Sequence, residues 1–107
     1  MKKYTVALTS ALLISFCWSG VLAQSGSFKP KNGFVSDEKT AVRVGEAILA
    51  DIYGERQIAS ERPFSAKLKN GIWIVTGTFP KGQRFGGVAE IRISKTDGCV
   101  LSATHGQ

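Results

Sequence analysis

The residues that could do chemistry are few, and the single histidine comes first. His105 lies at the end of the last predicted strand. Histidine is the usual general base because its ordinary pKa lies near neutral pH. A histidine in this place is expected to be exposed and to have no catalytic role. Serines and aspartates also occur, but no Gly-x-Ser-x-Gly motif or similar local signature brings a nucleophile and a base together.

Metal and phosphate sites are not predicted either. A zinc or copper site needs several His or Cys ligands, and the chain beyond its N-terminal signal keeps only His105 and Cys99. The glycine-rich stretch 82–87 lacks the Gly-Lys-Ser/Thr ending of a phosphate loop, and a strand follows it where a phosphate loop requires a helix. We therefore predict no enzyme activity, no cofactor and no metal.

The same glycine-flanked loop suits a contact surface. Arg84 and Phe85 lie at its tip, and arginine and aromatic side chains are enriched among the residues that anchor protein interfaces. The alternative is that Phe85 folds back onto the edge of the sheet. The residues alone leave both interpretations open.

Residues 1–23 are predicted to form a cleaved secretory signal. Lys2 and Lys3 give a positive start, residues 6–18 are mostly apolar, and small or aliphatic residues lead to a predicted cut after Ala23. A membrane anchor is the alternative, but the apolar run is shorter than the ~20 residues that span a bilayer. We therefore expect export to the periplasm and no membrane contact after cleavage.

Cleavage would leave 84 of the 107 residues, enough for one small domain. The net charge would fall from +6 to about +4 because Lys2 and Lys3 leave with the signal. Basic residues alternate along the predicted strands and do not cluster with aromatic residues, so nucleic-acid binding is not predicted. Cys17 also leaves, and the remaining Cys99 has no partner for an internal disulfide.

Residues 24–35 are rich in Ser, Gly, Lys, Pro and Asn and are predicted to be a flexible lead. Residues 36–107 are predicted to form a single domain that begins with a helix. Ser36 is the expected N-cap, with acidic residues in the first turn, and Gly54 is the expected end. A short helical turn is expected around Gln57. The first helix is amphipathic, with apolar residues at helical spacing: Ala41, Val44, Ile48 and Ile52, widened by Ala47 and Leu49.

Asn70-Gly71 is the strongest hairpin signal in the chain, because a type I′ turn needs positive φ at both central residues. It should join a strand over residues 64–69 to one over residues 72–79. The second strand is apolar on both faces, with Ile72 and Ile74 on one side and Trp73, Val75 and Phe79 on the other. Trp73 is expected in the core beneath the helix.

One helix can cover only one face of a sheet, so the face with Ile72 and Ile74 is predicted to contact a partner. The loop residues Arg84 and Phe85 belong to the same predicted interface. Two more strands are expected over residues 88–94 and 99–104, with Cys99, Leu101 and Ala103 on one side of the last strand. The order predicts an α+β fold, in which one N-terminal amphipathic helix packs on a four-stranded antiparallel meander.

The sequence resembles a family of small bacterial immunity proteins over about residues 36–106. Many of the matching residues are turn glycines and core positions, and they fall in these segments: Asp37-Glu38-Lys39-Thr40-Ala41, Glu46-Ala47-Ile48-Leu49, Ile52-Tyr53-Gly54, Arg62-Pro63-Phe64, Asn70-Gly71-x-Trp73-x-Val75-x-Gly77-Thr78, Pro80-x-Gly82, Gly86-Gly87-Val88-Ala89 and Lys95-x-Asp97-Gly98. The family has a nuclear-transport-factor-two-like fold and belongs to polymorphic or Rhs-type toxin systems. The resemblance implies a protein that binds and blocks a cognate toxin and has no catalytic residues. Cys99 stands where a polar residue is more usual in the family.

The resemblance and the export signal together predict a periplasmic immunity protein that neutralises a toxin by stoichiometric occlusion. Two alternatives stay open at this stage, since fold does not decide function. One is a periplasmic peptidase inhibitor or PepSY-like regulatory module. The other is a small-ligand-binding domain with a pocket between the helix and the sheet. The sequence makes no prediction of oligomeric state.

Overall fold

The structure, a computed structural model, describes residues 26–83 and 86–106. The predicted signal, with its cut after Ala23, lies outside the described residues, as do Arg84 and Phe85. Within the described part of the chain, no helix has the length and apolar character needed to cross a membrane.

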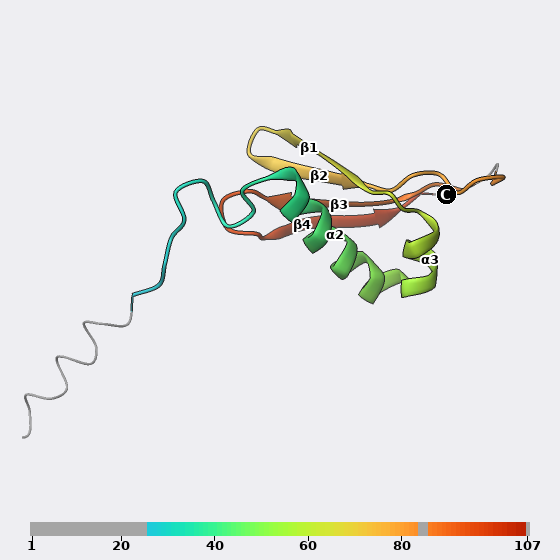
Figure 1. The fold of residues 1–107 in the computed structure, drawn as a ribbon, viewed down its shortest axis with the longest axis horizontal. Coiled ribbons are helices and arrows are strands. Elements are labelled where there is room, and N and C mark those ends of the chain that lie inside the picture. Colours follow the sequence, from blue (N-terminus) through green and yellow to red (C-terminus); the bar gives the residue numbers. More distant parts are fainter. Residues whose placement is uncertain (1–25, 84–85, 107) are drawn as a thin grey trace, which may run out of the picture.

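In the described part of the chain, two helices precede four strands (Figure 1). The helices are α2, Glu38–Tyr53, and α3, Glu55–Ser60. The strands are β1, Ser65–Lys69; β2, Ile72–Thr76; β3, Ala89–Ser94; and β4, Val100–His105. They form one antiparallel sheet in the order β1-β2-β3-β4. The predicted α+β meander is therefore confirmed, with α3 where a short helical turn is expected.

Helix α2 begins one residue later than the sequence predicts, and its N-cap is Asp37, not Ser36. The Asp37 carboxylate accepts a hydrogen bond from the Thr40 amide at 2.8 Å, and this bond lowers the pKa of Asp37. A carboxylate at the N-cap also interacts favourably with the helix dipole, which a serine does not. The helix ends at Gly54, with φ of 99°, as predicted.

The hairpin forms as predicted, with φ of 50° at Asn70 and 77° at Gly71. Strand β2, however, ends at Thr76 and not at Phe79. The amide of Thr78 donates to the Glu61 carbonyl at 2.7 Å, so the chain leaves the sheet to bond with the end of α3. Phe79 is consequently exposed and does not share the buried face of Trp73.

The core lies between α2 and one face of the sheet. Trp73 is buried there as predicted, and its indole N–H donates to the Val35 carbonyl at 2.8 Å. The helix approaches the sheet most closely at Gly45, where an added Cβ would lie 3.0 Å from side-chain carbons of Val75 and Ile91. The buried stripe of α2 therefore runs through Ala41, Gly45 and Leu49, whereas Ile52, predicted to be part of it, is half exposed.

The register of β4 is not the simple alternation that the sequence predicts. An irregularity between Arg92 and Ile93 places Val100 opposite Ile93. Ala103 packs against the core, but Leu101 is 52% exposed, so the two do not share a buried side. A bulge of this kind inserts an extra residue and changes which side chains face inward beyond it.

The chain before α2 runs beside the turn between β3 and β4 (Figure 1). The amides of Phe34 and Val35 donate to the carbonyls of Thr96 and Lys95 at 3.0 and 3.1 Å. Val35 is buried and belongs to the core, one residue before the predicted domain boundary at residue 36. Flexibility of residues 24–34 stays a prediction.

Candidate functional site

The predicted partner surface lies on the sheet face opposite α2, which we call the open face: Lys67, Lys69, Ile72, Ile74, Glu90 and Arg92, from strands β1, β2 and β3. Ile72 and Ile74 point to this face, since Trp73 and Val75 point into the core. Both isoleucines are half-buried, although α2 packs on the other side.

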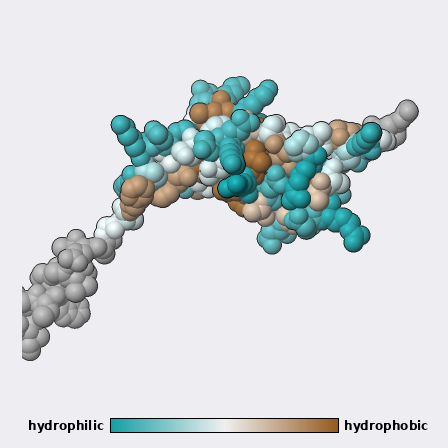
Figure 2. All heavy atoms as spheres, in the orientation of Figure 1, coloured by the Kyte–Doolittle hydropathy of each residue, from teal (hydrophilic) through white to brown (hydrophobic). Residues whose placement is uncertain are grey.

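Charged side chains surround the two isoleucines. The register places Ile74 between Lys67 of β1 and Arg92 of β3, while Lys69 lies opposite Ile72. A hollow of about 220 Å³ opens here, lined by Lys69, Asn70, Ile72, Ile74 and Arg92. The space-filling view shows hydrophilic side chains projecting around the folded part, with hydrophobic surface in small patches between them (Figure 2).

The structure brings together only two of the four predicted interface residues. Ile72 and Ile74 are neighbours on the open face, whereas Arg84 and Phe85 lie outside the described residues. The role of all four in an interface stays a prediction. Strand register brings three further residues to this surface: Lys67, Lys69 and Arg92. No local sequence motif predicts that they lie together.

A second cluster, absent from the sequence predictions, forms around Glu61 at the end of α3. The Glu61 side chain is completely buried. Its Oε1 accepts from the Ala89 amide at 2.6 Å, and its Oε2 accepts from Gln57 Nε2 at 2.9 Å and lies 2.8 Å from His105 Nε2. Burial raises the pKa of Glu61, but the hydrogen bonds from Gln57, the Ala89 amide and His105 outweigh it and lower the pKa below 4.5.

His105 is not the exposed bystander that its position predicts. Its side chain is 24% exposed, and its ring packs against Tyr53 with centroids 5.3 Å apart. Its Nε2 meets the Glu61 carboxylate and its Nδ1 lies 3.1 Å from the Gly106 carbonyl oxygen. Both partners are acceptors, so protonation of the ring lets both nitrogens donate. The hydrogen bond to Glu61 is the main cause that raises the pKa of His105 above 6.5.

The cluster fixes three elements at one corner of the fold. Glu61 links α3 to the start of β3 and the end of β4. Gly77 leaves room for it, because a Cβ there would lie 3.0 Å from Glu61 Oε1. Arg62, the next residue, bonds to Glu46 at 2.5 Å and to Glu55 at 3.1 Å across the corner between α2 and α3. This arrangement joins the helices to the sheet through hydrogen bonds and ion pairs, and it gives Glu61 and His105 a structural role.

An open hollow of about 580 Å³ lies beside this cluster, lined by Tyr53, Gln57, Gln83, His105 and Gly106. Two of its polar side chains, Gln57 and His105, are already engaged with Glu61. Among the described residues, no group of three or more His, Cys, Asp or Glu side chains could hold a metal ion. The geometry therefore offers surfaces for binding and structural ion pairs, with no assembled catalytic set in the described part of the chain.

A pair of helices followed by an open, antiparallel four-stranded sheet is consistent with an α+β fold of the nuclear-transport-factor-two (NTF2) type. Residues 40–107 match the family described as NTF2 fold immunity protein. The match covers more than half of the chain, so this chain belongs to that family. The family resemblance stated from the residues is confirmed.

Two proteins of Escherichia coli (strain K12) are similar to the chain. Uncharacterized protein YhhH is 30% identical over 82 residues, which is 77% of this chain and 64% of that protein. Uncharacterized protein YbbC is 34% identical over 71 residues, which is 66% of this chain and 58% of that protein. The chain thus spans less than two thirds of the length of either relative. No solved structure matches the chain.

Proposed function

We propose that the chain is an exported immunity protein that binds a cognate toxin in the periplasm and blocks it by stoichiometric occlusion. The family match over residues 40–107 carries this proposal, because an immunity protein family indicates toxin neutralisation in general. The periplasmic site of action and the occlusion are the parts that we add.

The side-chain geometry supports binding as the mode of neutralisation. His105, the single histidine of the chain, has both ring nitrogens within hydrogen-bond distance of acceptors on Glu61 and Gly106. These contacts give His105 a structural role in the Glu61 cluster. The open face, in contrast, presents half-buried apolar side chains to solvent, which is the surface type that a partner covers. A non-enzymatic inhibitor fits both observations.

The sequence of residues 1–23 supports the periplasmic part of the proposal. A positive start, a short apolar run and small residues before Ala23 are typical of a secretory signal. An immunity protein must meet its toxin in the compartment where the toxin acts. A toxin that attacks the cell wall or membrane from the periplasm therefore suits this chain.

Growth rescue tests the proposal. The toxin encoded beside this gene, directed to the periplasm of a host cell, should stop growth, and co-expression of the full chain should restore it. The matched control lacks residues 2–23 and stays in the cytoplasm, so it should fail to protect. Equal protection by both forms would contradict the periplasmic site. Absence of protection by exported, folded protein would contradict the immunity function.

Titration tests occlusion against catalysis. With purified proteins, inhibition of the toxin should rise in proportion to added chain and stop rising at stoichiometric amounts. The two proteins should co-elute in size-exclusion chromatography. Complete inactivation of the toxin by a small fraction of an equivalent would indicate turnover and contradict occlusion.

A further inference from the structure

The open face carries more than the two isoleucines. The register aligns Lys67, Ile74 and Arg92 in one row across three strands, and Lys69 lies opposite Ile72 in the next row. Directly opposite residues of an antiparallel sheet share a face, with Cβ atoms about 4.5–5.5 Å apart. The centre of this face is therefore aliphatic, and cations stand on both of its flanks.

The positive charge of this face is only partly neutralised within the chain. Glu90 Oε2 lies 3.3 Å from Arg92 Nε, and both side chains are in contact with solvent, so their attraction is weak. No carboxylate among residues 26–83 and 86–106 forms an ion pair with Lys67 or Lys69. The face therefore presents a net positive charge to a partner.

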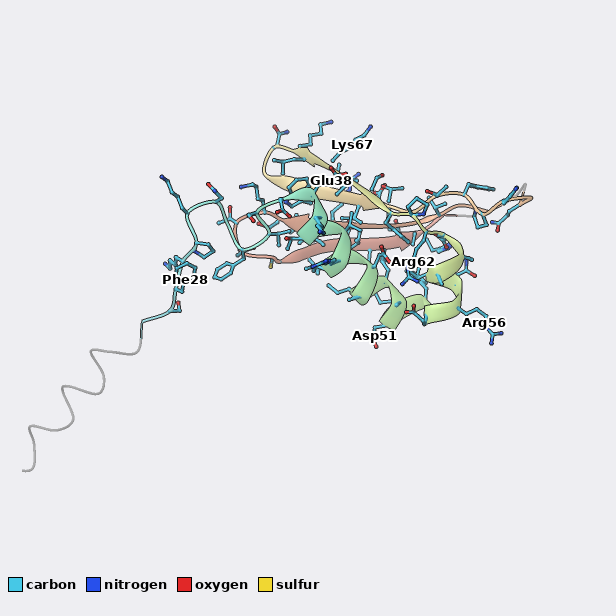
Figure 3. The ribbon with its side chains drawn as sticks, viewed as in Figure 1. Phe28, Glu38, Asp51, Arg56, Arg62 and Lys67 are labelled. Carbon is cyan, nitrogen blue, oxygen red and sulfur yellow. The ribbon has the colours of Figure 1, made fainter. Side chains whose placement is uncertain are left out.

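The helix layer has the opposite balance. Residues 37–62, which include both helices, carry six acidic and four basic side chains, whereas residues 63–107 carry two acidic and six basic ones. Figure 3 shows Lys67 beside β1 and Asp51 near the end of α2, on opposite sides of the ribbon. A negatively charged partner would consequently be attracted to the sheet and repelled by the helices.

We propose that the open face docks an acidic patch of the toxin, with one apolar side chain of the toxin entering the hollow beside Ile72 and Ile74. This inference rests on the proposed function and adds the chemistry of the partner. An apolar side chain would remove the remaining exposed surface of Ile72 and Ile74 from water, which slows dissociation. Carboxylates around it would pair with Lys67, Lys69 and Arg92, which accelerates association and selects the correct toxin.

A nucleic acid would suit the charge of this face but not its centre. Nucleic-acid bases stack on aromatic side chains, and phosphates require cations or polar donors. The residues between the cations are isoleucines, which offer neither. A protein surface supplies both carboxylates and an apolar side chain, so a protein is the better occupant.

Charge reversal and truncation test this docking surface. The Lys67→Glu/Lys69→Glu variant should bind the purified toxin at least about tenfold more weakly, mainly through slower association, and its affinity should depend less on salt. The Ile74→Ala variant should bind at least about tenfold more weakly through faster dissociation. Both variants should keep the circular dichroism spectrum of the parent chain, which shows that the loss is not one of folding.

The matched control is Lys39→Glu/Arg43→Glu, which makes the same charge change on exposed positions of α2. It should change the affinity by less than about twofold from that of the parent chain, because Lys39 and Arg43 lie on the helix layer and not on the open face. Unchanged affinity in both open-face variants would overturn the inference, as would an equal loss in the control. Salt-sensitive binding of the chain to a DNA duplex, lost in the lysine variant while toxin binding persists, would also overturn it.

The two proposals fail in different ways. If the parent chain does not protect cells, the immunity function fails and the docking surface fails with it. If the parent chain and both open-face variants protect cells and bind the toxin equally well, only the docking surface fails.

Discussion

The two faces of the sheet are built from neighbouring residues of the same strands, yet they differ in almost every physical property. On the covered face, Val75 and Ile91 are fully buried and touch the helix at Gly45. On the open face, Ile74 stands between Lys67 and Arg92 and is only half-buried. The covered face has its partner within the chain. The open face presents an aliphatic centre flanked by cations, which suits a partner from outside.

This difference separates stability from binding. Substitutions on the covered face should change the free energy of unfolding, because they remove packing that the fold requires. Substitutions on the open face should change toxin affinity and leave the fold intact.

A matched pair of isoleucine truncations should show the largest contrast. Ile91→Ala should lower the free energy of unfolding by about 2–5 kcal/mol, because it leaves a cavity in the core. Ile74→Ala on the open face should cost less than about 1.5 kcal/mol, because its side chain is only partly removed from water. Chemical denaturation monitored by Trp73 fluorescence measures both. Equal losses would show that the open face is part of the core.

A pair of glutamate truncations should give the next largest contrast. Glu61→Ala should cost about 1–3 kcal/mol, because it leaves the buried Ala89 amide without its acceptor. Glu90→Ala removes only a solvent-exposed pair with Arg92 and should cost less than about 1 kcal/mol. Urea denaturation at constant pH gives both values. An equal loss of unfolding free energy in Glu90→Ala and Glu61→Ala would contradict the weak, solvent-exposed nature of the Glu90–Arg92 pair.

Glu61 and His105, which meet at the corner beside α3, should contribute to the pH dependence of stability. The pKa of Glu61 is lowered below 4.5, so its contribution is present above pH 4.5 and is lost as pH falls through the folded-state value. The pKa of His105 is raised above 6.5, so its contribution is complete below pH 6.5 and is lost as pH rises through the folded-state value. The pair should therefore stabilise the fold most between pH 4.5 and 6.5.

His105→Ala tests this origin directly. In a series of thermal denaturations, the variant should lose the decline in stability that the parent chain shows as pH rises above 6.5. Arg92→Ala on the open face serves as the control and should keep the pH profile of the parent. If the His105→Ala variant kept the pH profile of the parent chain, the titration of another group would cause the decline in stability above pH 6.5.

The smallest effect is expected at the N-terminus of α2. Asp37→Ala removes the carboxylate that accepts from the Thr40 amide, so the midpoint of thermal unfolding should fall by a few degrees. Ser36→Ala should leave it nearly unchanged, because Asp37 is the N-cap. A larger fall in the midpoint for Ser36→Ala than for Asp37→Ala would show that Ser36 is the N-cap, as the sequence predicts. Neither variant should affect toxin affinity.

Several features follow from the sequence alone because they depend on neighbouring residues. Asn70-Gly71 specifies the hairpin through backbone φ, and Gly54 ends α2 in the same way. Alternation along β2 separates Ile72 and Ile74 from Trp73 and Val75, since side chains of a strand point to opposite faces in turn. These local rules also predict the order of the elements and hence the fold class.

Other features required the tertiary structure because they depend on residues that are distant in the chain. Glu61 and His105 are 44 positions apart, and nothing near either residue predicts that their side chains form a part-buried contact. The helix packs through Gly45, a residue with no side chain to enter a hydrophobic pattern, so the periodicity of α2 predicts a buried stripe displaced toward Ile52. The bulge in β4 likewise depends on its pairing with β3.

The candidate binding surface combines both kinds of information. The sequence by itself determines that Ile72 and Ile74 share a face that one helix cannot cover, because the period of a strand is two. Only the register decides that Lys67 and Arg92 flank Ile74, because strand pairing sets which residues of three separate segments become neighbours. The sequence alone therefore predicts the apolar centre of the open face, and strand pairing determines which charged residues surround it.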